Sequence, residues 1–409
     1  MHAAPRLRTL CILCSLCVLC FGGRVATAQA QEPAAPQAVG QKELQAAIDK
    51  LGDLDYDTRT GASRTIRRAE GTQAVPALLQ AVAEHRDGYV RYRALVLLTG
   101  FNDPRTNDAI RESLKSPNDR LRTVAYSYLE HNPNRAMLPE LLKALETELA
   151  EFVRPALIRA LAAAGDDPRV QSVLVREAAR GEDFFRSAVI EALGDYKAKY
   201  AFEALVKVAV LEGPLQDDAA LALGKIGDKR ALELLAGLQR SAPRPTQPTV
   251  AAAICLLGVN CESHENYLVQ TLKFADTNPG FQELLRGSAS GLGALGVAGH
   301  DSVLVPLLQV GIPSRDPVRA PIALALATIA LRNTPVMLTF LEKNRAPASG
   351  RPVLEERNVL NLVAEGFDML EEDLDKERFF ALVRRTYWQS ADGSVTRSLM
   401  QRLIGELAF

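Results

Sequence analysis

The sequence predicts an all-α fold, a right-handed α-α superhelical solenoid of about ten stacked helix pairs. Three observations predict it. A helix–turn–helix pattern recurs every 30 to 36 residues, small residues recur at one helical position of most copies, and aromatic residues make up only 6% of the chain. Two short helices cannot bury both of their apolar stripes alone, so each pair needs neighbouring copies. The 409 residues are therefore expected to form one continuous body rather than two or three domains.

The clearest copy of the pattern is LQDDAALALGKIGDKRALELL, residues 215–235. Its first helix is expected to end at Gly224, because glycine adopts the left-handed conformation that closes many helices. A short turn follows, and a second helix is expected to begin near Ala231. The Asp228 carboxylate is placed to accept hydrogen bonds from the free backbone N–H groups at that start.

The other copies align on the first residue of the second helix in each pair, which we call position zero. Positions 0, +4, +7 and +8 share one face of a helix, so they are predicted to form the core. Position +4 is mostly alanine, which lets neighbouring helices approach closely, and position +8 is mostly leucine. Weaker copies begin near Glu356 and Val395. The residues at position zero are Thr58, Val90, Leu121, Val153, Phe185, Leu215, Thr249, Leu285 and Val318.

Four of these stretches resemble HEAT repeats of the armadillo-like helical superfamily, in particular the bacterial HEAT-like repeats of phycobilisome lyases. They are DGYVRYRALVLL (87–98), EDFFRSAVIEALGD (182–195), ALALGKIGD (220–228) and RDPVRAPIALAL (315–326). The resemblance covers roughly residues 55–335 and implies an α-solenoid. It leaves function open, because such repeats occur in scaffolds, adaptors and a few enzyme subunits.

Residues 1–30 have the composition of a secretory signal peptide. Arg6 and Arg8 precede an apolar run at 10–23, and small residues before Ala28 and Ala30 offer a cleavage site after either alanine. Cysteines also lie in the apolar run, but the large residues before them differ from the small residues of a lipoprotein signal. The sequence therefore predicts an exported protein, periplasmic or secreted, rather than a lipid-anchored one.

Three further parts are expected after the signal peptide. Residues 31–41 are rich in Pro and Ala and are predicted to be a flexible leader. Residues 42–335 form the repeat solenoid, and 336–409 contain degenerate repeats and a C-terminal cap. Insertions such as 241–249 and 342–356 interrupt the later repeats.

The charge balance disfavours nucleic acid and anionic lipid as partners. Removing residues 1–30 leaves 45 basic and 49 acidic residues, a net charge near −4. No later apolar run is long enough to span a membrane. A protein or peptide partner is the expectation, and the oligomeric state stays open.

The sequence contains no recognisable catalytic, cofactor or metal motif. Cys255 and Cys261 are the only cysteines after the signal peptide, and their spacing permits a disulfide without requiring it. Together with His264 they lack a fourth ligand and match no familiar zinc spacing. Neither a Gly-rich phosphate loop nor a nucleophile elbow is present.

An Arg follows position zero in most repeats, and an acid precedes many of these Arg residues by a few positions. The Arg row could bind a polyanion. Alternatively, it could form a ladder of Asp–Arg ion pairs that connect adjacent repeats. Position +1 lies about 100° from the core direction, which points it at the neighbouring repeat and favours the ladder. The ladder residues are Arg91, Arg122, Arg154, Arg186 and Arg319 with Asp87, Asp119, Asp183 and Asp316.

Positions +2 and +6 lie opposite the core and are predicted to form the concave, solvent-facing surface. Its residues form a mixed polar strip, suited either to a partner protein or to solvent alone. The candidate residues are Tyr92, Val96, Thr123, Ser127, Arg159, Ser187, Glu191 and Asp217. We therefore expect an exported, non-catalytic scaffold that binds a protein or peptide there. The alternatives are polyanion or cell-wall polymer binding through the Arg row, and a lyase-type enzyme subunit, which only the family resemblance implies.

Overall fold

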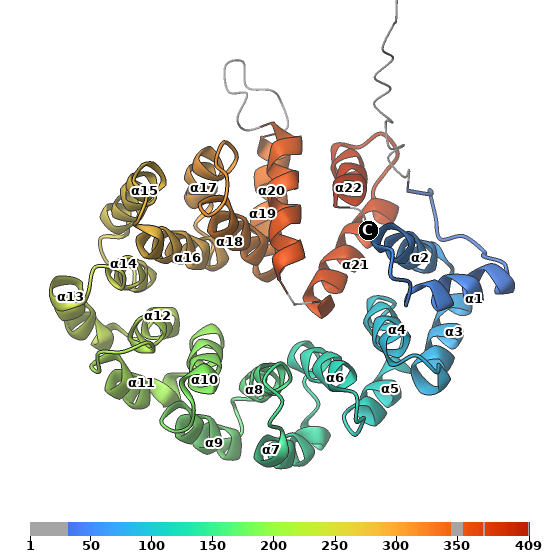
Figure 1. Cartoon of the computed structure of the whole chain (residues 1–409), viewed down its shortest axis with the longest axis horizontal. Helices are drawn as coiled ribbons and strands as arrows, with labels where there is room; N and C mark the ends of the chain where they lie inside the picture. The colour runs from blue at the N-terminus through green and yellow to red at the C-terminus, as the bar shows by residue number, and fades with distance from the viewer. Residues whose placement is uncertain (1–31, 345–354, 371–372, 408) are drawn as a thin grey trace, which may run out of the picture.

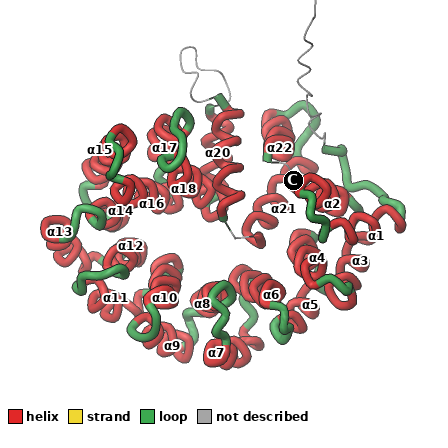
Figure 2. The backbone as a smooth tube through the Cα atoms, in the orientation of Figure 1, coloured by secondary structure: helices red, strands yellow, loops and turns green. Residues whose placement is uncertain are grey.

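The chain folds into a ring of paired helices (Figure 1). The computed structural model describes residues 32–344, 355–370, 373–407 and 409. These residues form 22 α-helices and no strand (Figure 2), apart from an isolated bridge between Gln37 and Ala69. The predicted all-α solenoid is confirmed.

The helices have the following bounds. The first half contains α1 (Gln41–Lys50), α2 (Tyr56–Arg68), α3 (Gly71–Glu84), α4 (Gly88–Gly100), α5 (Thr106–Ser113), α6 (Asp119–His131), α7 (Leu138–Thr147), α8 (Arg154–Ala163), α9 (Pro168–Ala178), α10 (Asp183–Asp195) and α11 (Phe202–Ala209). The second half contains α12 (Gln216–Ile226), α13 (Leu232–Ser241), α14 (Gln247–Leu256), α15 (Cys261–Thr277), α16 (Gln282–Ala298), α17 (Leu304–Gly311), α18 (Arg319–Arg332), α19 (Thr334–Lys343), α20 (Glu356–Met369), α21 (Asp373–Gln389) and α22 (Val395–Glu406).

The helices form two concentric layers. From α3 to α18 the odd-numbered helices lie outside and the even-numbered helices lie inside, where each even helix packs on the next even one (Figure 1). Because the two helices of a pair run antiparallel, the loops within pairs that the structure describes lie on one rim of the ring. We call this the intra-pair rim, and we call the rim that carries the loops between pairs the inter-pair rim.

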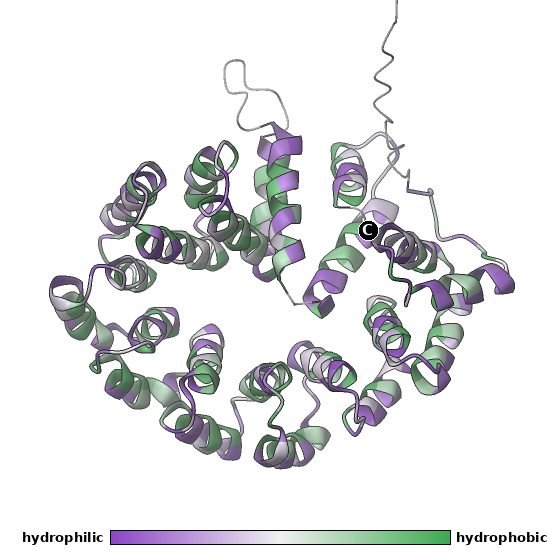
Figure 3. Ribbon diagram, viewed as in Figure 1, coloured by the Kyte–Doolittle hydropathy of each residue, from purple (hydrophilic) through white to green (hydrophobic). Residues whose placement is uncertain are grey.

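The core lies between the two layers, where apolar residues predominate (Figure 3). Most predicted core positions are buried, as Leu121, Ala125 and Leu129 of α6 show. At position zero, Thr58, Phe185 and Val318 are only half-buried. The 3.6-residue period of the inner helices therefore predicts most of the core correctly.

The predicted helix end at Gly224 is wrong. Helix α12 continues to Ile226, and Gly227, with φ of +77°, adopts the left-handed closing conformation. Gly224 lies within the helix, where the absence of a side chain lets α14 approach closely. A Cβ at this position would stand 2.5 Å from Cα of Ala253. Asp228 accepts a hydrogen bond from the backbone N–H of Arg230, as expected at the start of the next turn.

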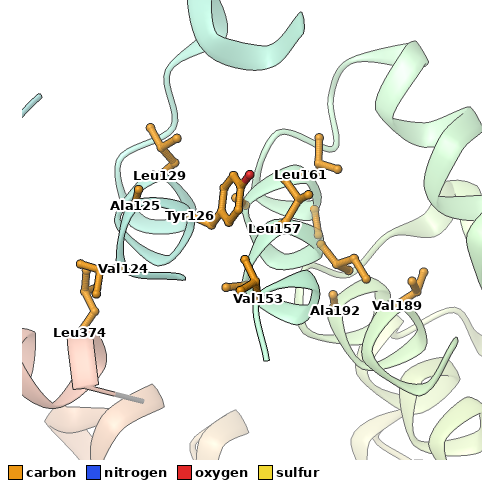
Figure 4. Close-up of a cluster of buried hydrophobic side chains, with 14 of the residues drawn as sticks. Val124, Ala125, Tyr126, Leu129, Val153, Leu157, Leu161, Val189, Ala192 and Leu374 are labelled. Atoms are coloured by element: carbon orange, nitrogen blue, oxygen red, sulfur yellow. The ribbon is translucent and has the colours of Figure 1, made fainter. Parts of the chain in front are cut away.

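Helix α21 closes the ring by packing against α4 and α6, far earlier in the chain. Its Leu374 belongs to the apolar cluster of the N-terminal half and points toward Val124 of α6 (Figure 4). A degenerate repeat and cap were predicted for this region. The structure instead shows a closing element that joins the two ends of the solenoid.

The segment 32–40 docks against this closure. The indole N–H of Trp388 donates to the carbonyl of Pro33 at 3.0 Å, and the Tyr387 hydroxyl donates to the carbonyl of Glu32 at 3.2 Å. Gln73 holds both backbone groups of Val39. The prediction of a flexible leader is therefore wrong for residues 32–40, because buried partners on α21 and α3 hold them.

Buried ion pairs tie the ends together. Arg67 of α2 donates to both carboxylate oxygens of Glu377 at 2.6 to 3.1 Å, with side chains only 7% and 3% exposed. Arg384 pairs with Glu32 at 2.9 Å and also donates to the carbonyl of Arg67. Burial lowers the pKa of Arg384 to about 10. Removing one partner of such a pair typically costs about 3–5 kcal/mol, because the other charge stays buried.

No single helix among the described residues is long and apolar enough to cross a membrane, although α18 and α19 pass that test together as a pair bent by 107°. Most of the predicted insertion at 342–356 lies outside the described residues. Of the predicted insertion at 241–249, residues 242–246 form the link between α13 and α14, and 247–249 begin α14.

Candidate binding surface on the inner face of the ring

Two of the predicted concave-surface residues do not face solvent. Tyr92 and Val96 of α4 are 5% and 1% exposed. Tyr92 packs against Tyr89 and the Arg120 guanidinium, and α21 covers the inner side of α4. The prediction was wrong at α4 because ring closure buries what an open solenoid would expose.

The other predicted residues keep solvent access on the inner face of α6 to α12. Thr123, Ser127, Ser187 and Asp217 are half-buried, and Glu191 is exposed. Ser187 of α10 donates a 2.6 Å hydrogen bond to Asp218 of α12. We use the name inner face for this region.

Arg159 of α8 is at the centre of an ion-pair network on the inner face. It donates to Glu130 of α6 and to Asp195 of α10, both at 2.9 Å, and Lys225 of α12 donates to the same Asp195 at 2.7 Å. Burial alone would lower the pKa of Arg159. The carboxylates of Glu130 and Asp195 have the larger combined effect, so the pKa of Arg159 is raised above its usual value. Burial likewise raises the pKa of Asp195, but Lys225 and Arg159 lower it below its usual value. Four successive inner helices are thus linked by charge.

The same network reaches across the ring to its C-terminal part. Arg332, the last residue of α18, lies 3.5 Å from Glu130 of α6 and 3.9 Å from Asp375 of α21. His131 Nε2 lies 2.7 Å from Asp375. Burial raises the pKa of Asp375, but the hydrogen bond to His131 and the nearby Arg332 lower it well below its usual range.

Unlike Arg159, Asp195 and Lys225, Glu191 forms no ion pair within the described part of the chain. It is solvent-exposed, yet protein surrounds it on most sides. Burial raises its pKa, and repulsion from Asp218 raises it further. The pKa of Asp218 is also raised, first by burial. This part of the inner face therefore has acidic groups that a cation would stabilise.

The Arg row serves the structure. Each Arg at position +1 that the sequence placed in the ladder donates to a backbone carbonyl near the end of the preceding outer helix, which satisfies carbonyls left free there. The pairs are Arg91 to Val82, Arg122 to Ser116, Arg154 to Leu145, Arg186 to Ala178, and Arg319 to Gly311.

The acids that pair across repeats were not those predicted. Arg122, Arg154 and Arg319 reach Glu148, Glu177 and Glu365 of the following repeats.

Asp119 and Asp183 pair with Arg122 and Arg186 of their own helices, at 2.7 and 2.9 Å. The carboxylates of Asp87 and Asp316 accept from backbone N–H groups at the starts of α4 and α18. The prediction of an Asp–Arg ladder between repeats was wrong in its partners, because acids one turn away cap or pair locally.

Gln216 occupies position +1 of its repeat, where most repeats have an Arg. Its side-chain amide, 4% exposed, donates to the carbonyl of Ala209 at 3.1 Å and so makes the same contact as the Arg residues. The sequence could have indicated this contact, because Gln at position +1 also carries N–H donors for a backbone carbonyl.

The cysteine pair lies at the junction of α14 and α15. A disulfide joins Cys255 to Cys261, whose Cα atoms are 4.1 Å apart. The histidine beside it is His300, whose Nδ1 lies 3.8 Å from Cys261 Sγ. Bonded to one another, the sulfurs are not thiolate ligands.

A hollow opens where α21 meets α4 and α6. It is lined mostly by polar side chains, including Asn102, Asn132, Arg378 and Arg385. None of these residues was singled out from the sequence, because the hollow exists only through ring closure.

The family of HEAT repeats matches the sequence twice, over residues 44–130 and 75–162. No curated protein matches the chain.

Among solved structures, the complex of CpcE and CpcF of phycocyanin lyase from Nostoc sp. PCC7120 is similar at 20% identity, covering 66% of this chain and 97% of that one with a TM-score of 0.40. Importin beta is similar at 15% identity and a TM-score of 0.40, covering 88% of this chain and 54% of its own. Kap121p bound to RanGTP is similar at 15% identity and a TM-score of 0.37, covering 89% and 45%. The chain thus spans about half the length of the importin-type proteins. At these scores the likenesses carry no argument about function. The chain is shown to carry HEAT repeats, matched over residues 44–162 within the α-solenoid.

Proposed function

We propose that this protein is an exported, non-catalytic HEAT-repeat scaffold that binds a protein or peptide partner on the inner face of its ring. The observation that carries the proposal is Glu191, an exposed acid without an ion pair in the described residues, beside Asp217 and Asp218. Burial and then repulsion from Asp218 raise the pKa of Glu191, and a Lys or Arg side chain of a partner would favour its charged form.

The surrounding network supports this use. Arg159, Asp195 and Lys225 are held by one another and so keep the surface rigid. A rigid polar surface loses less conformational freedom on binding than a mobile one.

The alternative of polyanion binding loses its motivation, because the Arg row donates to backbone carbonyls and to Glu residues inside the protein. The lyase alternative rests on resemblance alone.

The binding test is crosslinking in intact cells that express the tagged full-length chain, followed by identification of the attached protein. We expect one reproducible exported partner, lost in a Glu191→Lys, Asp217→Lys variant. Arg159 is left unchanged because its reversal would break the network.

The control is Glu112→Lys on the outer helix α5, which should keep the partner. Circular dichroism must show the same helix content in each variant. An identical set of crosslinked proteins in all three samples would refute binding at the inner face.

Export is tested separately by cell fractionation and N-terminal sequencing of the mature chain. We expect a new N-terminus at Gln29 or Gln31, outside the cytoplasm. An intact N-terminus in the cytoplasmic fraction would refute export and leave the binding question open.

A further inference from the structure

Large apolar side chains that remain exposed gather on one rim of the ring. Ten of the twelve exposed large apolar residues in the described chain lie in or beside loops within helix pairs, so they occupy the intra-pair rim. They are Leu54, Tyr56, Leu149, Phe152, Phe184, Val210, Leu211, Phe274, Phe281 and Val395. The other two, Met369 and Leu382, lie at the end of α20 and within α21. Loops as such are equally frequent on both rims, so the asymmetry needs another reason.

The densest group comes from three successive intra-pair loops, between α7 and α12. Leu149 and Phe152 are 79% and 74% exposed, and Phe184 and Leu211 are 51% and 63% exposed. With Val210 they form what we call the rim cluster. Single exposed apolar residues are ordinary, whereas contiguous groups mark interaction sites.

Contacts beneath the rim cluster show that two of its three loops are neighbours. The guanidinium of Arg154 lies 5.2 Å from the ring of Phe185, and that ring lies 5.4 Å from the ring of Phe184. Arg154 begins α8 and Phe185 lies in the first turn of α10. The apolar side chains of these two loops therefore lie next to one another, over the contact between Arg154 and Phe185.

Acidic residues surround the rim cluster. Segments 146–154, 180–186 and 210–216 contain six Asp or Glu residues and three Arg residues. All three Arg residues are engaged, Arg154 and Arg180 with Glu177 and Arg186 with Asp183.

Three of the acids, Glu151, Glu182 and Glu212, form no ion pair within the described residues. The positive ends of α8, α10 and α12 point to this rim and offset part of that charge, about half an elementary charge per helix. The net charge around the rim cluster therefore stays negative.

This combination decides between possible occupants. A second copy of the same rim would bring acids against acids, and an anionic membrane would be repelled for the same reason. A segment with apolar residues on one side and Lys or Arg residues beside them matches both features.

We propose that the rim cluster docks a basic amphipathic segment of a partner protein. This surface is separate from the inner face and does not depend on it. Phe152 and Phe184 supply the apolar anchors, and Glu151, Glu182 and Glu212 set the preference for a cationic partner.

The probe is a fluorescent 18-residue helical peptide of Leu and Lys with one apolar face, compared with the same design carrying Glu in place of Lys. Binding to the full-length protein is followed by fluorescence anisotropy. We expect saturable binding of the Lys peptide that weakens with salt, and much weaker binding of the Glu peptide.

Three variants locate the site. Phe152→Ser with Phe184→Ser should weaken binding at least about tenfold, as aromatic anchors do. Glu151→Lys with Glu212→Lys should weaken it too, with the salt dependence reduced. Leu54→Ser with Tyr56→Ser, exposed on the same rim outside the cluster, is the matched control and should bind like the wild type.

Equal binding of both peptides, or equal affinity of the Phe152/Phe184 variant and the control, would overturn the proposal. Dimerisation in sedimentation that the Phe substitutions abolish would also overturn it in favour of a second copy. Binding to phosphatidylcholine–phosphatidylglycerol vesicles that the same substitutions abolish would point to lipid instead. Because none of these variants changes Glu191 or Asp217, failure here leaves the inner-face proposal standing.

Discussion

A recurring Arg joins two levels of this structure. At position +1 the guanidinium satisfies carbonyls at the end of its own outer helix, and in α6, α8 and α18 it also reaches a Glu of the following repeat. Five donors in a planar group allow both contacts at once. Gln216, with fewer donors, keeps the carbonyl contact. The Arg row therefore resembles a binding stripe in sequence while serving the stacking of repeats.

Asp218 provides a test at the residue scale. Its folded-state pKa is raised, so the folded state holds a proton that the unfolded chain has lost, and stability falls as pH rises from about 4 through the folded pKa. Asp218→Asn keeps an acceptor for Ser187 and removes this titration. We expect the variant to gain stability relative to the wild type as pH rises from about 4 to about 7. Urea unfolding across that range measures it.

A constant difference between the Asp218 variant and the wild type at every pH would contradict the assignment.

At the element scale, glycines inside inner helices set how closely neighbouring helices approach. A Cβ on Gly224 would stand 2.5 Å from Cα of Ala253, so α12 and α14 must separate to accept one. Gly237 of α13 has open space around it. The two positions look alike in sequence and differ only in packing.

Gly224→Ala should destabilise the protein by about 1–3 kcal/mol through overpacking. Gly237→Ala should instead stabilise it by about 0.5–1 kcal/mol, because alanine loses less backbone entropy in a helix. Chemical denaturation of both variants measures the difference. A loss of similar size at both positions would mean that helix approach at Gly224 is not limiting.

Much of this element scale could be predicted from the sequence, because neighbouring repeats carry the same periodic pattern. Leu121, Ala125 and Leu157 are buried as that pattern requires. The pattern failed at Tyr92 and Val96, since their cover comes from α21, which lies about 280 residues later in the chain. Local periodicity contains no information about such distant contacts.

At the scale of the whole molecule, the two ends of the solenoid meet. Arg67 with Glu377 and Glu32 with Arg384 are buried ion pairs between segments more than 300 residues apart. Leu374 extends the N-terminal apolar core into α21 (Figure 4).

Glu377→Gln should weaken this closure by leaving the charge of Arg67 buried and unpaired, at a cost of about 3–5 kcal/mol. Small-angle X-ray scattering should show a larger radius of gyration, and denaturation a lower midpoint. Glu112→Gln, which removes an exposed pair with Lys115, should change neither property. An unchanged radius with an unchanged midpoint would show that the apolar contacts alone hold the ring shut.

An open array of repeats has two ends, and each terminal repeat lacks a neighbour on one side, so such arrays fray from their ends. Here α21 supplies the missing neighbour of the first repeats. Each repeat of the ring therefore packs against a neighbour on both sides. Backbone amides of α1 to α4 should then exchange with heavy water as slowly as those of α8 and α10. With the ring opened, exchange should quicken first at α2 and α21 and spread inward from both sides.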